Sequence, residues 1–289
     1  MYTLISDYRD RSDLRQSFNQ LAKETFGIDF EAWYQEGYWN DNYRCYSYLY
    51  EDQVVANVSV NQLTLKIEGQ VYKALQIGTV MTHPDHRRRG LAYKLLDHVM
   101  TTWQDQVDFI YLFGNDLALD LYKSFNMVEF RENRFFMSPE GINHSGKARQ
   151  LDLSRNEDKS LMVNLCKKRV FASDGIGIQG DDHLLMFYCR QFYADHLYYL
   201  EGDQVILAAY VEEDCLHLVD VLWTQAKPLE DLLGQLPFKG YKTIEVHFKP
   251  EDRLIHETRP LEVEDQTLLI RSEDLHIKET FRFSSFSHA

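Results

Sequence analysis

Cysteine is scarce in this sequence, with four residues among 289. The four lie far apart and no two form a CxxC pair: Cys45, Cys166, Cys189 and Cys215. Disulfide frameworks and zinc sites show characteristic cysteine spacings that this chain does not have. We therefore expect four reduced thiols in a cytoplasmic protein, and neither disulfides nor a zinc site.

Long apolar runs are missing as well. No stretch of 18 or more apolar residues occurs, so the sequence predicts no membrane-spanning helix. The first 16 residues carry too many charges for a secretory signal. A hydrophobic content of 44% and a charged content of 26% are those of a soluble globular protein. The length suits two ordinary domains or one large domain.

Positive charge is in deficit. The chain has 31 Lys and Arg against 45 Asp and Glu, which gives a net charge of −14. General nucleic-acid binding needs a basic face, so this composition argues against it. The acidity is compatible with a cationic small substrate or a basic peptide, although acidity alone more often keeps a protein soluble. Against this background, three consecutive arginines at 87–89 stand out.

The first 137 residues predict a mixed α/β unit in the order β, α, α, β, β, β, α, β, α, β. Strands are expected at 1–6, 109–113 and 127–138, and as three runs within 43–83. Turns between these three runs are expected at Glu51-Asp52 and Glu68-Gly69. Helices are expected at 12–27 and 115–126, and an aromatic helix or helix–loop segment is expected at 30–41. Another helix should begin at Arg89 or Gly90, because the apolar residues from Ala92 to Trp103 form one continuous stripe.

The second half partly repeats the first. "YSYLYEDQVVANVSV" (46–60) aligns with "LYYLEGDQVILAAYV" (197–211), and later strands follow in the same order. The second copy has no arginines or glycine at its strand-to-helix turn, so we expect the chemistry in the first. Residues 138–148 are the best linker, which predicts domains at 1–140 and 149–289. The glycine-containing segment 173–182 is expected to be a loop.

The stretch "THPDHRRRGLA" (82–92) predicts an anion site. A strand that turns into a helix leaves backbone N–H groups free at the helix start, and these attract phosphate. Gly90 allows a ligand to approach the backbone, and the arginines add fixed positive charge. The sequence contains neither GxxxxGK[ST] nor GxGxxG, so a P-loop NTPase and a dinucleotide-binding fold are both disfavoured.

The spacing Arg87-x-x-Gly90-x-Ala92 resembles the acetyl-CoA pyrophosphate loop of the GCN5-related N-acetyltransferase (GNAT) superfamily. Asn115, Ala118, Leu121 and Tyr122 match that superfamily's N-x-x-A-x-x-L-Y helix one strand later. Asn126-Met127 replaces its usual Gly-Phe, and asparagine tolerates the left-handed conformation there. The sequence of the turn, together with the second GNAT-like unit, resembles the Eis-like branch of this superfamily. That branch usually adds a third domain and ends in a catalytic carboxylate, a role not carried over because this chain ends at Ala289, near the end of the second unit.

The resemblance implies a GNAT acyl-CoA acyltransferase fold, an α/β mixed sheet, in tandem with a degenerate second GNAT-like unit. It implies acetyl-CoA as co-substrate and a cytoplasmic N-acetyltransferase acting on a small-molecule or peptide amine, and it leaves a homodimer open. The expected contacts to acetyl-CoA are Val80, Met81, Thr82, Arg87, Arg88, Arg89, Gly90, Leu91, Ala92 and Asn115. Tyr122 would protonate the leaving sulfur, since phenol and thiol pKa values lie within about 2 units.

Several residues have a second interpretation. Trp33, Tyr34, Tyr38 and Trp39 could line the acceptor site or pack in the core. Asn115 could be a helix N-cap as well as a ligand contact. His83 and His86 have metal-like spacing but no third ligand nearby, so they are interpreted as loop residues and no metal is expected.

The general base is not identified, because "VYKALQIGTVMTHP" (71–84) contains no carboxylate. That absence favours one rival reading, a CoA-binding regulatory or interaction module with weak turnover. A purely structural scaffold would require the whole arginine turn to be coincidental. The sequence does not rank the acceptors, among which polyamines, aminoglycosides, amino acids and lysine side chains all remain open.

Overall fold

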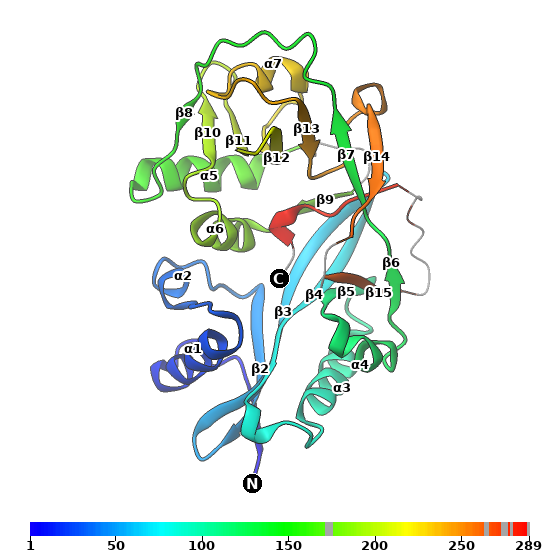
Figure 1. Ribbon diagram of the computed structural model, residues 1–289. Coiled ribbons are helices and arrows are strands. Elements are labelled where there is room, and N and C mark those ends of the chain that lie inside the picture. Colours follow the sequence, from blue (N-terminus) through cyan, green and yellow to red (C-terminus); the bar gives the residue numbers. More distant parts are fainter. Residues whose placement is uncertain (171–175, 263–265, 273–276, 278–279, 288–289) are drawn as a thin grey trace.

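The chain folds around two mixed β-sheets, which lie one above the other in Figure 1. The structure is a computed structural model that describes residues 1–170, 176–262, 266–272, 277 and 280–287. Within these ranges no helix has the length and apolar character needed to cross a bilayer.

The first sheet has eight strands in the order β1-β2-β3-β4-β5-β15-β6, with β9 paired to β3. Their bounds are β1 Thr3–Ser6, β2 Tyr43–Tyr50, β3 Gln53–Ile67, β4 Gln70–Thr82, β5 Phe109–Gly114, β6 Val128–Phe130, β9 Ile176–Gln179 and β15 Thr267–Arg271. Strands β1 to β4 are antiparallel neighbours, whereas β4 and β5 run parallel. The two predicted hairpin turns are confirmed, and their four residues, Glu51, Asp52, Glu68 and Gly69, all have positive φ.

Helices cover both faces of this sheet, with α1 and α2 on one side and α3 and α4 on the other (Figure 1). The helical segments of this half are α1 Ser12–Phe26, α2 Glu31–Gln35, η1 Pro84–His86, α3 Leu91–Trp103, η2 Asp116–Ala118 and α4 Leu119–Lys123. Helix α3 begins directly after Gly90, which confirms the predicted start. Its buried stripe, with Leu95, Leu96 and Val99, packs on β3 and β4. The aromatic segment 30–41 is helical over only five residues.

The second sheet has seven strands in the order β14-β7-β13-β12-β11-β10-β8. Its strands are β7 Asn133–Met137, β8 Arg149–Gln150, β10 Leu197–Leu200, β11 Val205–Glu212, β12 Cys215–Leu222, β13 Thr243–Val246 and β14 Glu257–Pro260. The remaining helical segments are α5 Asn156–Lys168, α6 Asp182–Gln191, α7 Leu229–Leu233, η3 Asp252–Leu254 and η4 Ser285–Ser287. The antiparallel pair β10–β11 and the parallel pair β12–β13 correspond to β2–β3 and β4–β5, so the tandem arrangement is confirmed.

The two halves exchange strands. Strand β7, from the first half of the chain, lies between β13 and β14 of the second sheet. Strand β15, from the end of the chain, lies between β5 and β6 of the first sheet. Each sheet therefore needs a strand from the other half, which couples the folding of the two units.

The single strand predicted at 127–138 is wrong, because it is two strands in different sheets. Glu132 lies at the break: it is buried, and its carboxylate accepts the backbone N–H of Phe283 at 2.7 Å. Asn133 N–H donates to Phe281 O, so the chain here runs beside the C-terminal segment. The loop expected at 173–182 is wrong for residues 176–179, where the alternately buried Ile176 and Ile178 form β9, and residues 173–175 lie outside the described ranges.

Candidate active site

Strand β4 is irregular at Thr79. Asn57 of β3 is opposite Met81, and Ser59 is opposite Gly78, so two residues of β4 face one residue of β3. Thr79 has a φ of +49°, an uncommon conformation for a β-branched residue. This is a β-bulge, a feature that leaves backbone groups unpaired and redirects side chains.

Strand β4 also loses its other neighbour at this point. Its parallel register with β5 ends at Ile77–Leu112, while β5 continues to Gly114 beside β15. Residues 78–82 therefore have register partners only in β3 among the described strands. The resulting open backbone edge can pair with an extended ligand, as an additional strand would.

A buried polar network holds the bulge. Asn57 Nδ2 donates to the carbonyl of Thr79 at 2.9 Å and to Ser59 Oγ at 2.8 Å. Tyr43 Oη donates to the same Ser59 Oγ at 2.8 Å and lies 3.2 Å from Thr79 Oγ1. Asn57 and Ser59 are fully buried, so each lost bond would leave an unsatisfied polar group. The sequence signal for this network is the run of polar residues at alternate positions of "VANVSVNQ", which was not recognised as part of the site.

The arginine turn follows β4 directly. Arg88 and Gly90 both have positive φ, at 59° and 73°, and Gly90 is the N-cap of α3. No side chain caps this helix, and its first turn contains no acidic residue. A Cβ placed on Gly90 would meet no atom within 4 Å, so the glycine faces open space. The helix start therefore has the arrangement expected of an anion site, and binding of an anion there stays a prediction.

The three arginines are not equivalent. Arg87 Nε donates to the carbonyl of Thr82, and Arg89 donates to Tyr2 Oη and to the carbonyl of Asp85. Both side chains therefore tie the turn to the rest of the domain. The exposed Arg88 has no hydrogen bond or ion pair to any described residue, which leaves its guanidinium available to a ligand.

Tyr122 lies on α4, packed against the end of β5. Its ring contacts Gly114 so closely that a Cβ at residue 114 would stand 2.8 Å from Tyr122 Cε2. Burial raises the pKa of Tyr122 to about 12, so the phenol is protonated at neutral pH. Gly114 was also not recognised as a site residue from the sequence. Its signal was a glycine ending the apolar strand "FIYLFG".

These elements border one cavity of about 590 Å³. Gly78, Thr79 and Val80 of the bulge line it, together with Asn115 and Tyr122. Asn115 makes no capping bond with its side chain, and it is exposed. Aromatic and aliphatic side chains, among them Trp33 of α2, Phe113 of β5 and Phe187 of α6, form most of the remaining wall. Of the residues predicted for the site, the cavity therefore brings together Val80, Asn115 and Tyr122.

The other predicted contacts lie around this cavity. Met81 points into the core beside α1, so only its backbone faces the open edge. Leu91 is buried under α3, and Ala92 is partly exposed in its first turn. Thr82, partly buried, accepts the bond from Arg87. His83 accepts from the Asp85 amide at 3.3 Å, and His86 lies 2.9 Å from Tyr2 Oη.

Of the four aromatic residues proposed for the acceptor wall, Trp33 lines the cavity. Its indole donates to the carbonyl of His183 on α6, so it joins the two halves. Trp39 is buried in the core beneath α1 and α2. Tyr34 stacks under Arg15 and donates to Asp10, and Tyr38 is half-buried beside the main cores. None of these three is among the residues that line the cavity.

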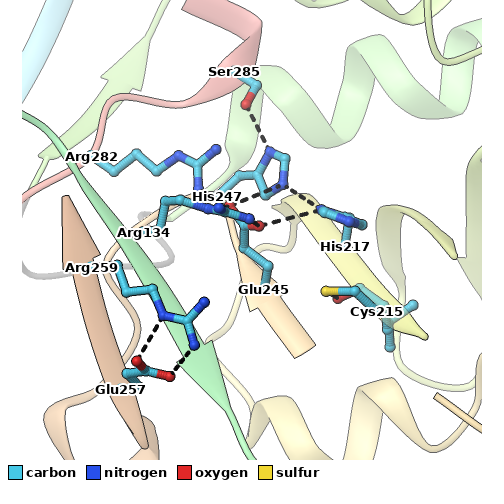
Figure 2. Close-up of polar contacts among 10 residues, drawn as sticks. Arg134, Cys215, His217, Glu245, His247, Glu257, Arg259, Arg282 and Ser285 are labelled. Carbon is cyan, nitrogen blue, oxygen red and sulfur yellow. Dashed lines mark hydrogen bonds and ion pairs between the residues drawn. The ribbon is translucent and has the colours of Figure 1, made fainter. Parts of the chain in front are cut away.

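The second half contributes polar groups to the same cavity: His247 after β13, and Arg282 and Ser285 from the C-terminal segment. Figure 2 shows these side chains converging around Glu245. Ser285 Oγ lies 3.0 Å from His247 Nδ1, and His247 Nε2 lies 3.2 Å from His217 Nδ1. Sequence analysis had no local signal for this group, because its members meet only through the packing of the two sheets.

Glu245 is the charged centre of this group. Burial alone would raise the pKa of its carboxyl, but hydrogen bonds from Arg134 and Arg282 outweigh that effect and hold the pKa at about 2. Cys215, His217 and Glu245 place ligand atoms within 4.8 Å of one another. Both carboxylate oxygens are already bound to guanidinium groups, and a metal ion would add positive charge beside two arginines. The trio therefore fits a metal poorly.

Residues 10–127 match the acetyltransferase (GNAT) domain model. The matched segment includes the bulge of β4, the arginine turn, Asn115 and Tyr122, which agrees with the family resemblance of the sequence.

Solved structures share the fold over nearly the whole chain. A probable N-acyltransferase from Enterococcus faecalis V583 aligns with a TM-score of 0.64 at 13% identity, covering 94% of this chain and 73% of its own. Eis1 from Mycobacterium abscessus aligns with a TM-score of 0.62 at 12% identity, covering 93% and 73%. A GCN5-related N-acetyltransferase from Kribbella flavida aligns with a TM-score of 0.59 at 12% identity, covering 94% of this chain and 72% of its own. At these identities the likeness concerns the fold alone. No curated protein sequence matches the chain.

Proposed function

We propose that this protein is an acetyl-CoA-dependent N-acetyltransferase, in which a primary amine of a small molecule or peptide attacks the thioester directly. One observation carries the proposal: the bulge of β4, Asn115 and Tyr122 line one cavity, and the arginine turn follows the same strand. The tandem arrangement shared with Eis1 of M. abscessus supports a place in the Eis-like branch.

Acetyl-CoA would bind along the open edge of β4. Its pantetheine arm would pair with the backbone of 80–82, and its pyrophosphate would lie on the free N–H groups at the start of α3. Arg88 would contact the phosphate oxygens, while Arg87 and Arg89 hold the turn in shape. The thioester would then reach the bulge, beside Asn115 and Tyr122.

At the bulge, the amine nitrogen bonds to the carbonyl carbon and the carbon–sulfur bond breaks. A backbone N–H near Val80 would stabilise the developing oxyanion, because a bulge leaves such donors unpaired. Tyr122 would donate its proton to the departing thiolate. Its raised pKa widens the gap to a thiol beyond the roughly 2 units of ordinary groups, but it keeps the acid protonated at working pH.

The proton of the amine needs an acceptor, and no Asp or Glu of the described chain lines the cavity. Ser285 and His247 do line it, 3.0 Å apart. Ser285 Oγ would take the amine proton while passing its own to His247 Nδ1. This pair would fill the role for which β4 provides no carboxylate.

The test is thiol release from acetyl-CoA with a panel of amines, comparing wild type with Tyr122→Phe. The variant keeps the ring but loses the acid, so we expect turnover to fall by roughly 10²-fold or more. Ser285→Ala should lower the rate at neutral pH more than at high pH, where the amine is already neutral. An unchanged rate in Tyr122→Phe would place the proton donor elsewhere.

The second candidate is a CoA-binding regulatory module with weak turnover. The absence of a carboxylate on β4 favours it. Binding of acetyl-CoA without thiol release from any amine would support this candidate over the enzyme.

A further inference from the structure

We infer that the amine acceptor is an apolar molecule that also carries a carboxylate, in the class of apolar amino acids, and that Arg282 binds this carboxylate. The inference rests on the proposed function, because it names the acceptor of that same cavity. It starts from Arg282, which lines the cavity although its side chain is only 7% exposed.

The guanidinium of Arg282 is not fully used by the protein. Its Nη1 donates to Glu245 Oε1 at 2.7 Å. Its Nε is buried and has no hydrogen-bond partner among the described residues. Buried donors are nearly always paired, so this nitrogen points to a missing acceptor. A ligand carboxylate can bind a guanidinium through two parallel hydrogen bonds.

The charges around Arg282 also leave a positive surplus. Arg134 and Arg282 share a single carboxylate, that of Glu245 (Figure 2). Arg259 on the neighbouring strand is already paired with Glu257. Glu132 interacts with Arg282 at longer range, but burial raises its pKa to about 7, so at neutral pH it offsets only part of the surplus. A bound anion would neutralise the remaining positive charge.

The remaining wall argues against a polycation. The lining is mainly aromatic and aliphatic, with Trp33, Phe113 and Phe187 as examples. Among the described residues, no acidic side chain lines the cavity. A polyamine or aminoglycoside would lose hydration for several ammonium groups there without gaining a carboxylate partner. The acidic net charge of the chain suggested a cationic acceptor, but that charge lies outside this cavity.

The same environment helps the chemistry. The amine must be neutral to attack, and both an apolar wall and a nearby guanidinium lower the pKa of an ammonium group. An α-amino acid bound through its carboxylate would place its amine in the cavity that Ser285 and His247 also line.

The experiment compares thiol release from acetyl-CoA for L-phenylalanine, L-leucine and L-methionine with release for their primary amides and for spermidine. The amides are a strict control. They keep the apolar side chain, and replacing the carboxylate lowers the amine pKa, which by itself would favour the amide. We expect kcat/KM for at least one acid to exceed that for its amide by about 10- to 100-fold, the range for a charge-assisted hydrogen bond.

Two variants locate the effect. Arg282→Met should remove the preference for the acid, whereas Arg134→Met, which loses the other partner of Glu245 outside the cavity, should keep it. Preference for an amide or for spermidine in the wild type would overturn the inference while leaving the acetyltransferase proposal intact. Release from none of these amines would also overturn it, and calorimetry with acetyl-CoA would then decide separately on CoA binding. The wild-type comparison stays decisive if Arg282→Met fails to fold.

Discussion

Replacing Gly114 with alanine should slow catalysis by displacing Tyr122. The added Cβ would lie 2.8 Å from Tyr122 Cε2, 3.0 Å from Cδ2 and 3.1 Å from Leu269 Cδ1. Since carbon atoms in contact need at least about 3.5 Å, the ring must retreat by roughly 0.7 Å. Tyr122 is buried in a core that includes Leu269, so the ring cannot move without shifting its neighbours.

Two consequences follow for Gly114→Ala. Overpacking should cost about 1–3 kcal/mol of unfolding free energy, measured by thermal or urea denaturation. Displacement of the proton donor should reduce kcat for thiol release by about 10- to 100-fold, because misplacing a catalytic group by ~1 Å costs about this much. Gly202→Ala is the matched control, since a Cβ at residue 202 would meet no atom within 4 Å.

A double-mutant cycle makes the reasoning refutable. If Gly114 acts through Tyr122, the variant Gly114→Ala/Tyr122→Phe should turn over no more slowly than Tyr122→Phe alone, apart from effects of lost stability. Normal turnover in Gly114→Ala, alongside impaired turnover in Tyr122→Phe, would show that this contact does not position the acid. Strictly additive losses would lead to the same conclusion.

The other predictions concern the scaffold of the site. Asn57→Val removes the hydrogen bonds to the carbonyl of Thr79 and to the buried Ser59. It should lower the free energy of unfolding, measured by urea denaturation, by about 1–3 kcal/mol and should also lower kcat/KM for acetyl-CoA. An unchanged kcat/KM would show that the bulge keeps its shape without Asn57. Arg169→Met leaves the buried Asp181 and Asp220 without their guanidinium and should cost about 3–5 kcal/mol; stability equal to wild type would contradict this. The pKa of Glu245 is depressed to about 2, so its contribution to stability is complete above about pH 4.5 and is lost as pH falls towards 2. Glu245→Gln should flatten the fall in unfolding free energy over that window, and an unchanged slope would argue against the assigned pKa.

Much of the first unit could be predicted from local sequence. The apolar stripe from Ala92 to Trp103 and the glycine before it located α3, because helix periodicity and capping are properties of neighbouring residues. Tyr122 was singled out because its motif is local, although the single helix predicted at 115–126 is the turn η2 followed by the short α4. The proposed domain boundary within 138–148 stays a prediction.

The features that were missed depend on contacts between distant residues. "MVEFRENRFFMS" has one continuous strand pattern, yet its halves enter different sheets because Glu132 binds the amide of Phe283, 151 residues away. The bulge at Thr79 depends on a side chain of β3, since threonine itself does not favour positive φ. Arg282 lines the same cavity as Tyr122 although it lies 160 positions later, and no local pattern could place the two residues together.

The most direct test of the account is calorimetric titration of acetyl-CoA into the wild-type protein and into Arg88→Ala. The account predicts saturable binding at one site per chain, weakened in the variant because Arg88 is the arginine of the turn left free for phosphate. Acetyl-pantetheine, which lacks the pyrophosphate, should bind more weakly and be insensitive to the variant. No detectable binding of acetyl-CoA to the wild type would contradict the central claim that the bulge and the arginine turn form an acetyl-CoA site.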